Sequence, residues 1–145
     1  VFDARTYKKI KEFSYNTQGW GLTNDGQSLI LSDGTNNLYY YHPDSLTVSH
    51  IVSVTDRNGP VANINELEYI NGYVYANQWE TPYILKIELP SGKVVGRIDL
   101  DNLRREAMHN YHQSEVVNGI AYDSTTGKIY VTGKKWPHLY EIQLH

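Results

Sequence analysis

Short runs of alternating hydrophobic and polar residues, separated by turn residues, recur along this chain. Residues 63–79 show the pattern most clearly, because two runs rich in isoleucine, valine and tyrosine flank the dipeptide Asn71-Gly72. Asn-Gly between two such runs is a strong signal for a two-residue β-hairpin turn. Asn65 and Glu66 stand at the start of the first run and Trp79 follows the second. The two ends of an antiparallel hairpin are neighbours, so the pattern predicts polar groups and an indole side by side.

The same unit occurs three times. Trp20-Gly21-Leu22, Asn65-Glu66-Leu67 and Asn118-Gly119-Ile120 fall into register, and a short strand, a Gly-containing turn and a second strand follow each. The predicted later strands are residues 28–32, 37–41 and 48–54; then 73–77, 83–89 and 93–99; then 128–132 and 138–144. Repeats of about 45–55 residues with four strands each are typical of β-propeller blades.

The chain is therefore predicted to be all-β and part of a single propeller domain. The predicted divisions are the end of an earlier blade (1–15, with 7–13 as its outermost strand), a blade (16–56), a second blade (57–101), a helical insertion (102–115) and a last blade lacking its outer strand (116–145). Roughly three blades do not close a ring, which usually needs about four to eight. Either this sequence is part of a longer chain, or another copy completes the ring.

One segment departs from the strand pattern. Residues 103–114 combine helix-forming residues with no β alternation, which predicts a short helix between blades. Glu106, His109 and His112 have the spacing of metal ligands on a helix, although solvent-exposed histidines are the more ordinary explanation.

Composition narrows the possible partners. The chain has 145 residues, a formal net charge of -3 and a pI of about 6.0, which does not favour nucleic acid or anionic membrane as the main partner. It has no cysteine, so disulfides, thiolate metal sites and a cysteine nucleophile are excluded. No apolar run approaches the ~20 residues that span a bilayer. The sequence begins at Val1, in what resembles the middle of a strand, so we expect further residues upstream.

Chemistry is expected at one end of the channel that the first strands line. The start of the first strand and the end of the second strand of each blade meet there, because the two strands are antiparallel. The residues at these positions are Trp20, Asp33, Asn65, Glu66, Trp79, Asn118, Lys134, Lys135 and Trp136. Apolar walls with a few fixed polar groups are typical of a small-ligand pocket.

Each of these residues also has a structural explanation. A tryptophan can be packed in the core, Asn118 and Asp33-Gly34 can be turn devices, and Lys134 with Lys135 can be a solvated pair. Gly19-Trp20-Gly21 does not complete a dinucleotide-binding motif, and the sequence contains no P-loop, nucleophile elbow or zincin motif. The functional hypothesis depends on several of these residues converging at one opening.

Six motifs together resemble the plant and bacterial type of glutaminyl cyclase (glutamine cyclotransferase). They are Gly19-Trp20-Gly21-Leu22-Thr23 with Ser32-Asp33-Gly34, Asn65-Glu66-Leu67-Glu68-Tyr69, Ala76-Asn77-Gln78-Trp79, Asn118-Gly119-Ile120-Ala121-Tyr122-Asp123 and Val131-Thr132-Gly133-Lys134-Lys135-Trp136-Pro137. The resemblance implies a five-bladed propeller that converts the N-terminal glutamine of a peptide or protein into pyroglutamate and releases ammonia. It implies no cofactor for catalysis, although a structural cation in the channel is possible. It also implies secretion or periplasmic export.

We expect Lys134, Asn65 and Glu66 to take part in catalysis, and Trp20, Trp79, Asn118 and Trp136 to bind substrate. The resemblance implies that the carboxylate that moves the proton lies in the first blades, upstream of Val1. Two alternatives stay open, since a propeller fold alone does not decide function. One is a non-catalytic propeller that binds peptides or glycans at the same opening, and the other is a lyase or lactonase with a channel metal.

Overall fold

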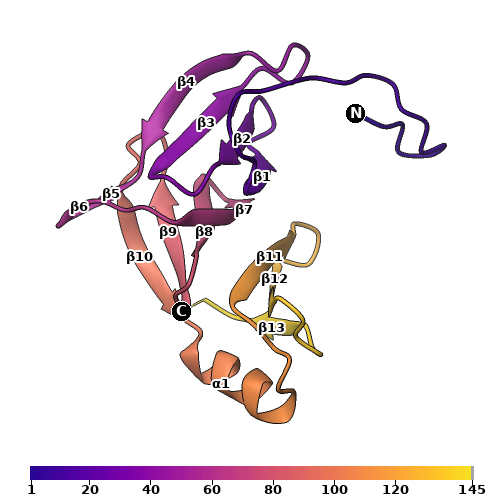
Figure 1. Cartoon of the computed structure of the whole chain (residues 1–145). Coiled ribbons are helices and arrows are strands. Elements are labelled where there is room, and N and C mark those ends of the chain that lie inside the picture. The colour runs from indigo at the N-terminus through magenta and orange to yellow at the C-terminus, as the bar shows by residue number, and fades with distance from the viewer. Residues whose placement is uncertain (145) are drawn as a thin grey trace.

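The computed structural model describes residues 1–144 and is built almost entirely from antiparallel sheets (Figure 1). The first sheet has the strand order β1-β2-β3-β4 and the second the order β10-β9-β8-β7. Their bounds are β1 (Gly21–Asn24), β2 (Leu29–Ser32), β3 (Asn37–Tyr41), β4 (Val48–Ser53), β7 (Ile64–Ile70), β8 (Tyr73–Gln78), β9 (Tyr83–Glu88) and β10 (Val94–Asp99).

A third sheet contains β11 (Val117–Asp123), β12 (Lys128–Gly133) and β13 (Tyr140–Ile142), in that order. A small hairpin of β5 (Thr55–Asp56) and β6 (Gly59–Pro60) connects the first two sheets. The one helix of residues 1–144 is α1 (Asp101–Asn110), which joins the second sheet to the third.

The first strands of the three sheets lie next to one another. β1 contacts β7, and β7 contacts β11. Each sheet therefore extends outward from an inner strand, as Figure 1 shows for the first two sheets. This is the blade arrangement predicted from the repeats, and the fold is of the β-propeller type. The grouping of residues 1–145 into one domain with the divisions given above stays a prediction.

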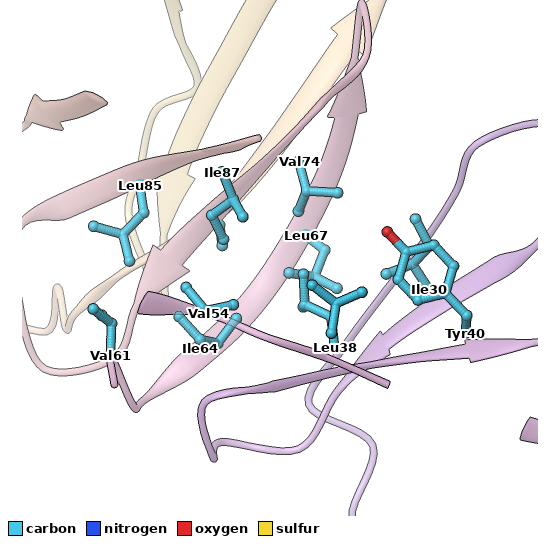
Figure 2. Close-up of a cluster of buried hydrophobic side chains, with 12 residues drawn as sticks. Ile30, Leu38, Tyr40, Val54, Val61, Ile64, Leu67, Val74, Leu85 and Ile87 are labelled. Carbon is cyan, nitrogen blue, oxygen red and sulfur yellow. The ribbon is translucent and has the colours of Figure 1, made fainter. Parts of the chain in front are cut away.

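Two clusters of buried side chains fill the spaces between neighbouring sheets. Ile30, Leu38 and Tyr40 of the first sheet pack against Leu67, Val74 and other residues of the second, as Figure 2 shows. On the opposite face of the second sheet, Tyr75 and Ile84 pack against the third sheet. Successive strand residues point to opposite faces, so Val74 and Tyr75 enter different clusters. The second sheet is therefore buried on both faces.

The hairpin turn predicted at residues 71–72 is confirmed. Asn71 and Gly72 have φ values of 49° and 88°, and Ile70 pairs with Tyr73. Two consecutive residues with positive φ form the turn type whose twist matches that of the flanking strands. Asn and Gly are the residues that adopt this conformation most readily.

The prediction for the first thirteen residues is wrong. Instead of two strands, the structure has a single antiparallel bridge between Phe2 and Lys9, and Tyr7 has a φ of 56°. The Asp3 carboxylate accepts hydrogen bonds from the backbone N–H groups of Arg5 and Thr6, which holds this segment in a turn. A strand needs a paired neighbour, and residues 1–13 have no neighbouring sheet within residues 1–144.

The predicted helix is confirmed but is shifted toward the N-terminus. It begins at Asp101, whose carboxylate pairs with Arg104 and Arg105 one turn further on. It ends at Asn110, before His112, because Tyr111 is extended. The hairpin β5–β6 was not predicted, since two-residue strands leave no periodic pattern. Within residues 1–144, no helix is long and apolar enough to cross a membrane.

Candidate functional site

Three of the predicted site residues meet at the end of the inner strands where the sequence predicts the opening of the channel. The indole rings of Trp20 and Trp79 lie edge to face, with their centres 6.1 Å apart. The Nζ atom of Lys134 lies 4.4 Å from the centre of the Trp79 ring. These residues precede β1, follow β8 and follow β12, so each sheet contributes one of them. The structure therefore confirms the predicted convergence of two indoles and one ammonium group.

Backbone contacts fix both indoles. The N–H of Trp20 donates to the carbonyl of Ser32, and the N–H of Trp79 donates to the carbonyl of Asn63. The Trp20 ring lies directly on Gly34, where a Cβ atom would come within 2.7 Å of the ring. Gly34 also has a φ of +85°, so this position favours glycine both for its conformation and for the approach of the indole.

Asn65 is buried, at 6% exposure, and is the second residue of the inner strand β7. Its backbone carbonyl accepts a hydrogen bond of 2.5 Å from the Ser32 hydroxyl. Within residues 1–144 its side-chain amide has no hydrogen-bond partner, yet it is not sealed from solvent. Buried polar groups are usually paired, so an available amide held by its backbone is suited to binding a substrate.

Glu66 lies in the seam between the second and third sheets. Its Oε2 accepts the backbone N–H of Ile120 at 3.0 Å. Among the ion pairs of residues 1–144 none joins Glu66 to Lys134. Burial raises the pKa of Glu66 to about 8, which the Ile120 N–H opposes and the charge of Glu68 reinforces. Glu66 is therefore largely protonated near neutral pH and connects two sheets.

Side-chain to backbone hydrogen bonds recur at equivalent repeat positions in the two seams. The Tyr122 N–H donates to Glu68 at 2.7 Å, and the Tyr69 N–H donates to Thr23 at 3.0 Å in the preceding seam. Burial raises the pKa of Glu68 as well, against the effect of the Tyr122 N–H. β1 and β7 thus each offer a side-chain oxygen to the backbone of the next inner strand.

Asn77 connects the second and third sheets, a role not predicted from the sequence. It is fully buried, and its Oδ1 accepts the Gly119 N–H at 2.9 Å. Its Nδ2 and the nearby Asn118 Oδ1 are buried without a hydrogen-bond partner in residues 1–144. The signal was present in the repeat, because Asn77 and Ser32 both follow the residue paired with the central leucine of the inner strand.

Asp33 has no free carboxylate oxygen to offer a ligand. It accepts hydrogen bonds from Thr17, Tyr39 and both the N–H and hydroxyl of Thr35. Partial burial raises its pKa, but these hydrogen bonds outweigh burial and hold the pKa below its usual value. These contacts agree with the structural explanation of Asp33 as a residue that forms a turn.

Trp136 does not join the opening, which corrects the expectation for this residue. It is 9% exposed, packs in the cluster between the second and third sheets, and donates from Nε1 to the Glu115 carbonyl at 2.8 Å. The physical reason is that the ring lies on Gly133, whose missing Cβ leaves room for it, and meets Tyr140 edge to face. Asn118 is half-buried at the start of the bulge in β11, toward the seam.

The two adjacent lysines differ in their contacts. Lys135 forms an ion pair with Glu115, whereas Lys134 is exposed and lies over Trp79. Only Lys134 therefore presents its charge to the opening.

No group of three or more His, Asp or Glu residues within residues 1–144 is placed to hold a metal ion. The expectation of a structural cation in the channel stays a prediction.

Comparison with known proteins identifies the family. A family model described as glutamine cyclotransferase matches residues 1–144. The chain belongs to the glutamine cyclotransferase family. It is 42% identical to a glutaminyl-peptide cyclotransferase of Arabidopsis thaliana over an alignment of 148 positions, which covers 99% of this chain and 46% of that protein.

A solved structure supports the same family. The crystal structure of Myxococcus xanthus glutaminyl cyclase matches with a TM-score of 0.84 and 40% sequence identity, over 89% of this chain and 56% of that one. The chain thus spans about half the length of the glutamine cyclotransferases that it matches. The resemblance stated from the six motifs is confirmed, and so is the propeller-type fold.

Proposed function

We propose that the protein containing this chain is a glutaminyl-peptide cyclotransferase, and that the opening above Trp79 binds the N-terminal glutamine of its substrate. The observation that carries the proposal is the meeting of Trp20, Trp79 and Lys134, one from each sheet, in a member of the glutamine cyclotransferase family. The substrate is a peptide or protein that begins with glutamine.

The reaction needs little besides positioning and charge stabilisation. The α-amine nitrogen bonds to the side-chain carbonyl carbon, the bond from that carbon to the amide nitrogen breaks, and the amine proton ends on the departing ammonia. Because nucleophile and electrophile belong to one residue, the enzyme gains most by holding the side chain curled in a near-attack geometry. The edge-to-face rings of Trp20 and Trp79 suit this task as one apolar wall that restricts the aliphatic part of the glutamine and excludes water.

Charge develops on the side-chain oxygen when the amine attacks. Lys134 is the cation at the opening, and we assign it to this oxygen or to a neighbouring substrate carbonyl. The available amide of buried Asn65 is assigned to the substrate backbone or amine. Glu66 is assigned a positioning role, since its carboxyl group contacts β11 and not the opening. Proton transfer is expected from a carboxylate elsewhere in the complete protein, as the family resemblance implies.

The test measures cyclisation of glutaminyl peptides by the complete protein and by its variants Trp79→Ala and Lys134→Ala. Ammonia release is the readout. Loss of one electrostatic contact to the developing oxyanion typically lowers kcat by about 10²–10³-fold. Lys135→Ala is the matched control, because Lys135 is the adjacent lysine but pairs with Glu115. We expect a small effect from the control and large losses in the two site variants, with unchanged circular dichroism.

Unchanged turnover in both site variants would remove these residues from the mechanism. Binding of glutaminyl peptides without any ammonia release would instead favour the non-catalytic alternative. Secretion or periplasmic export belongs to the same proposal, and localisation of the complete protein would test it.

A further inference from the structure

A second cavity lies beside Trp79. It has a volume of about 500 Å³ and is lined by residues 79–82, by Arg104 and Met108 of α1, and by Glu115 and Val116. Ligand pockets typically measure about 300–1,000 Å³, so this cavity is large enough for more than one amino-acid side chain. Figure 1 shows α1 outside the sheets, below the third sheet in that view.

The cavity adjoins the opening through two shared parts of the structure. Trp79 contributes to both. In addition, Lys134 exchanges backbone hydrogen bonds with the cavity floor, donating to the Val116 carbonyl at 2.9 Å and accepting the Glu115 N–H at 2.8 Å. A peptide whose first residue lies under Lys134 can therefore extend directly over residues 115–116.

We infer that this cavity, lined by α1, binds the second residue of the substrate peptide and selects for an apolar side chain there. The inference rests on the proposed function, because it places the N-terminal glutamine in the neighbouring opening. It assigns the inserted helix a role in substrate selection.

The chemistry of the walls supports an apolar occupant. Trp79, Pro82, Met108 and Val116 supply apolar surface. Met108 is 42% exposed although it is large and apolar, and methionine adapts its shape to varied partners. The preceding residue, Ala107, is buried in the core cluster, which anchors the helix and directs its next residue outward.

The charges of the lining leave a single unpaired carboxylate. Arg104 donates to Asp101, and Glu115 pairs with Lys135. Glu80 is exposed and takes part in none of the ion pairs of residues 1–144. Because Arg104 lines the same cavity, Glu80 alone does not set its charge; the apolar walls disfavour an acidic second residue, since they cannot solvate a carboxylate.

The cavity is also formed in advance of binding. The Thr81 hydroxyl and N–H both donate to the Gln78 carbonyl, at 2.8 Å and 3.1 Å, and the Leu100 N–H donates to the Pro82 carbonyl at 3.0 Å. These bonds tie the 79–82 loop to itself and to the start of α1. Glu80 has a φ of 63°, a conformation that costs a non-glycine residue free energy and is common at binding loops.

The test compares kcat/KM of the complete protein for the amides of Gln-Phe, Gln-Gly and Gln-Glu. Apolar pockets commonly discriminate by about 10–200-fold per methylene, but Met108 is partly exposed, so we expect roughly tenfold preference for Phe over Gly. Gln-Glu should be the poorest of the three. Met108→Ala should lower the Phe-to-Gly ratio about fivefold or more, whereas His109→Ala, at the next position of the helix and exposed, should leave this ratio unchanged.

Equal kcat/KM for the three substrates would overturn the inference, and so would an equal loss on Phe and Gly substrates in Met108→Ala. If no glutaminyl peptide is cyclised, the proposed function fails separately. The cavity is then tested by calorimetric binding of pyroglutamyl-Phe amide and pyroglutamyl-Gly amide. Tighter binding of the Phe compound that Met108→Ala removes would support the subsite, and equal affinities would refute it.

Discussion

Replacement of Glu66 by glutamine should make the protein more stable, and only above acidic pH. In the folded protein the half-buried Glu66 carboxyl lies in the seam between β7 and β11 and accepts the Ile120 N–H at 3.0 Å. Glutamine has nearly the same shape, keeps an oxygen for this hydrogen bond and never ionises. The substitution therefore removes the titration and retains the contact.

The sign of the pH dependence follows from the linkage between protonation of Glu66 and folding. Burial raises the pKa of Glu66 from 4.5 to about 8 in the folded state. Between these values the unfolded chain releases the proton and the folded chain retains it, so stability falls as pH rises, by about 1.4 kcal/mol per pH unit for a single group. Below pH 4.5 the effect is absent, and above pH 8 it is constant.

The pKa shift of Glu66 sets an upper limit on the stability difference between variant and wild type at pH 8. A full shift corresponds to roughly 5 kcal/mol, and residual access of water to the half-buried side chain reduces this to about 2–4 kcal/mol. Wild type and Glu66→Gln should therefore have similar free energies of unfolding at pH 5, and the variant should be more stable by this amount at pH 8.

The assay is equilibrium urea unfolding of the complete protein at pH 5, 6, 7 and 8, followed by tryptophan fluorescence. Glu12→Gln is the control, because Glu12 is exposed and pairs only with Lys9 on the surface. Its curve should run parallel to that of wild type at every pH. A constant difference between wild type and Glu66→Gln from pH 5 to pH 8 would refute the reasoning, because it would mean that Glu66 ionises alike in both states.

Two further substitutions test the packing around the site. Gly34→Ala should destabilise the protein by about 2–4 kcal/mol and alter tryptophan fluorescence, because the new Cβ meets the Trp20 ring; Gly26→Ala, with a similar φ of +89° but open space, should cost only about 1 kcal/mol. Similar losses in the two glycine variants would contradict the contact with Trp20. Asn77→Ala should cost about 2–3 kcal/mol in urea unfolding by leaving the Gly119 N–H unpaired, against less than 0.5 kcal/mol for exposed Asn58→Ala. A loss below 1 kcal/mol for Asn77→Ala would show that water reaches the seam.

Register explains which site residues could be predicted from the sequence. Leu22 pairs with Leu31, Leu67 with Ala76 and Ile120 with Val131. Three residues beyond Leu31, Ala76 and Val131 stand Gly34, Trp79 and Lys134, which therefore occupy one repeat position. Trp20 lies on Gly34 and against Trp79, and Lys134 lies over Trp79. The repeat alone was sufficient to bring these residues together.

The misplaced residues depend on contacts that local pattern does not encode. Trp136 follows the same strand end as Lys134 but lies two residues further on, and the space above Gly133 draws its ring into the core. Residues 1–13 alternate like strands, yet pairing requires a neighbour that residues 1–144 do not supply. The cavity beside Trp79 was also unpredicted, because it depends on how α1 packs against the 79–82 loop.

The site also depends on the seams between sheets. Trp20, Trp79 and Lys134 each flank a strand of a different sheet, so their separation is set by how the sheets are joined. The joints are polar and buried: Ser32 donates to the Asn65 carbonyl in one seam, and Glu66 and Asn77 accept N–H groups of β11 in the next. A seam variant that leaves each sheet folded should still move the indoles and the ammonium group apart, because near-attack geometry tolerates shifts of only about 1 Å. Asn77→Ala should therefore lower kcat for glutaminyl peptides even where the protein remains folded.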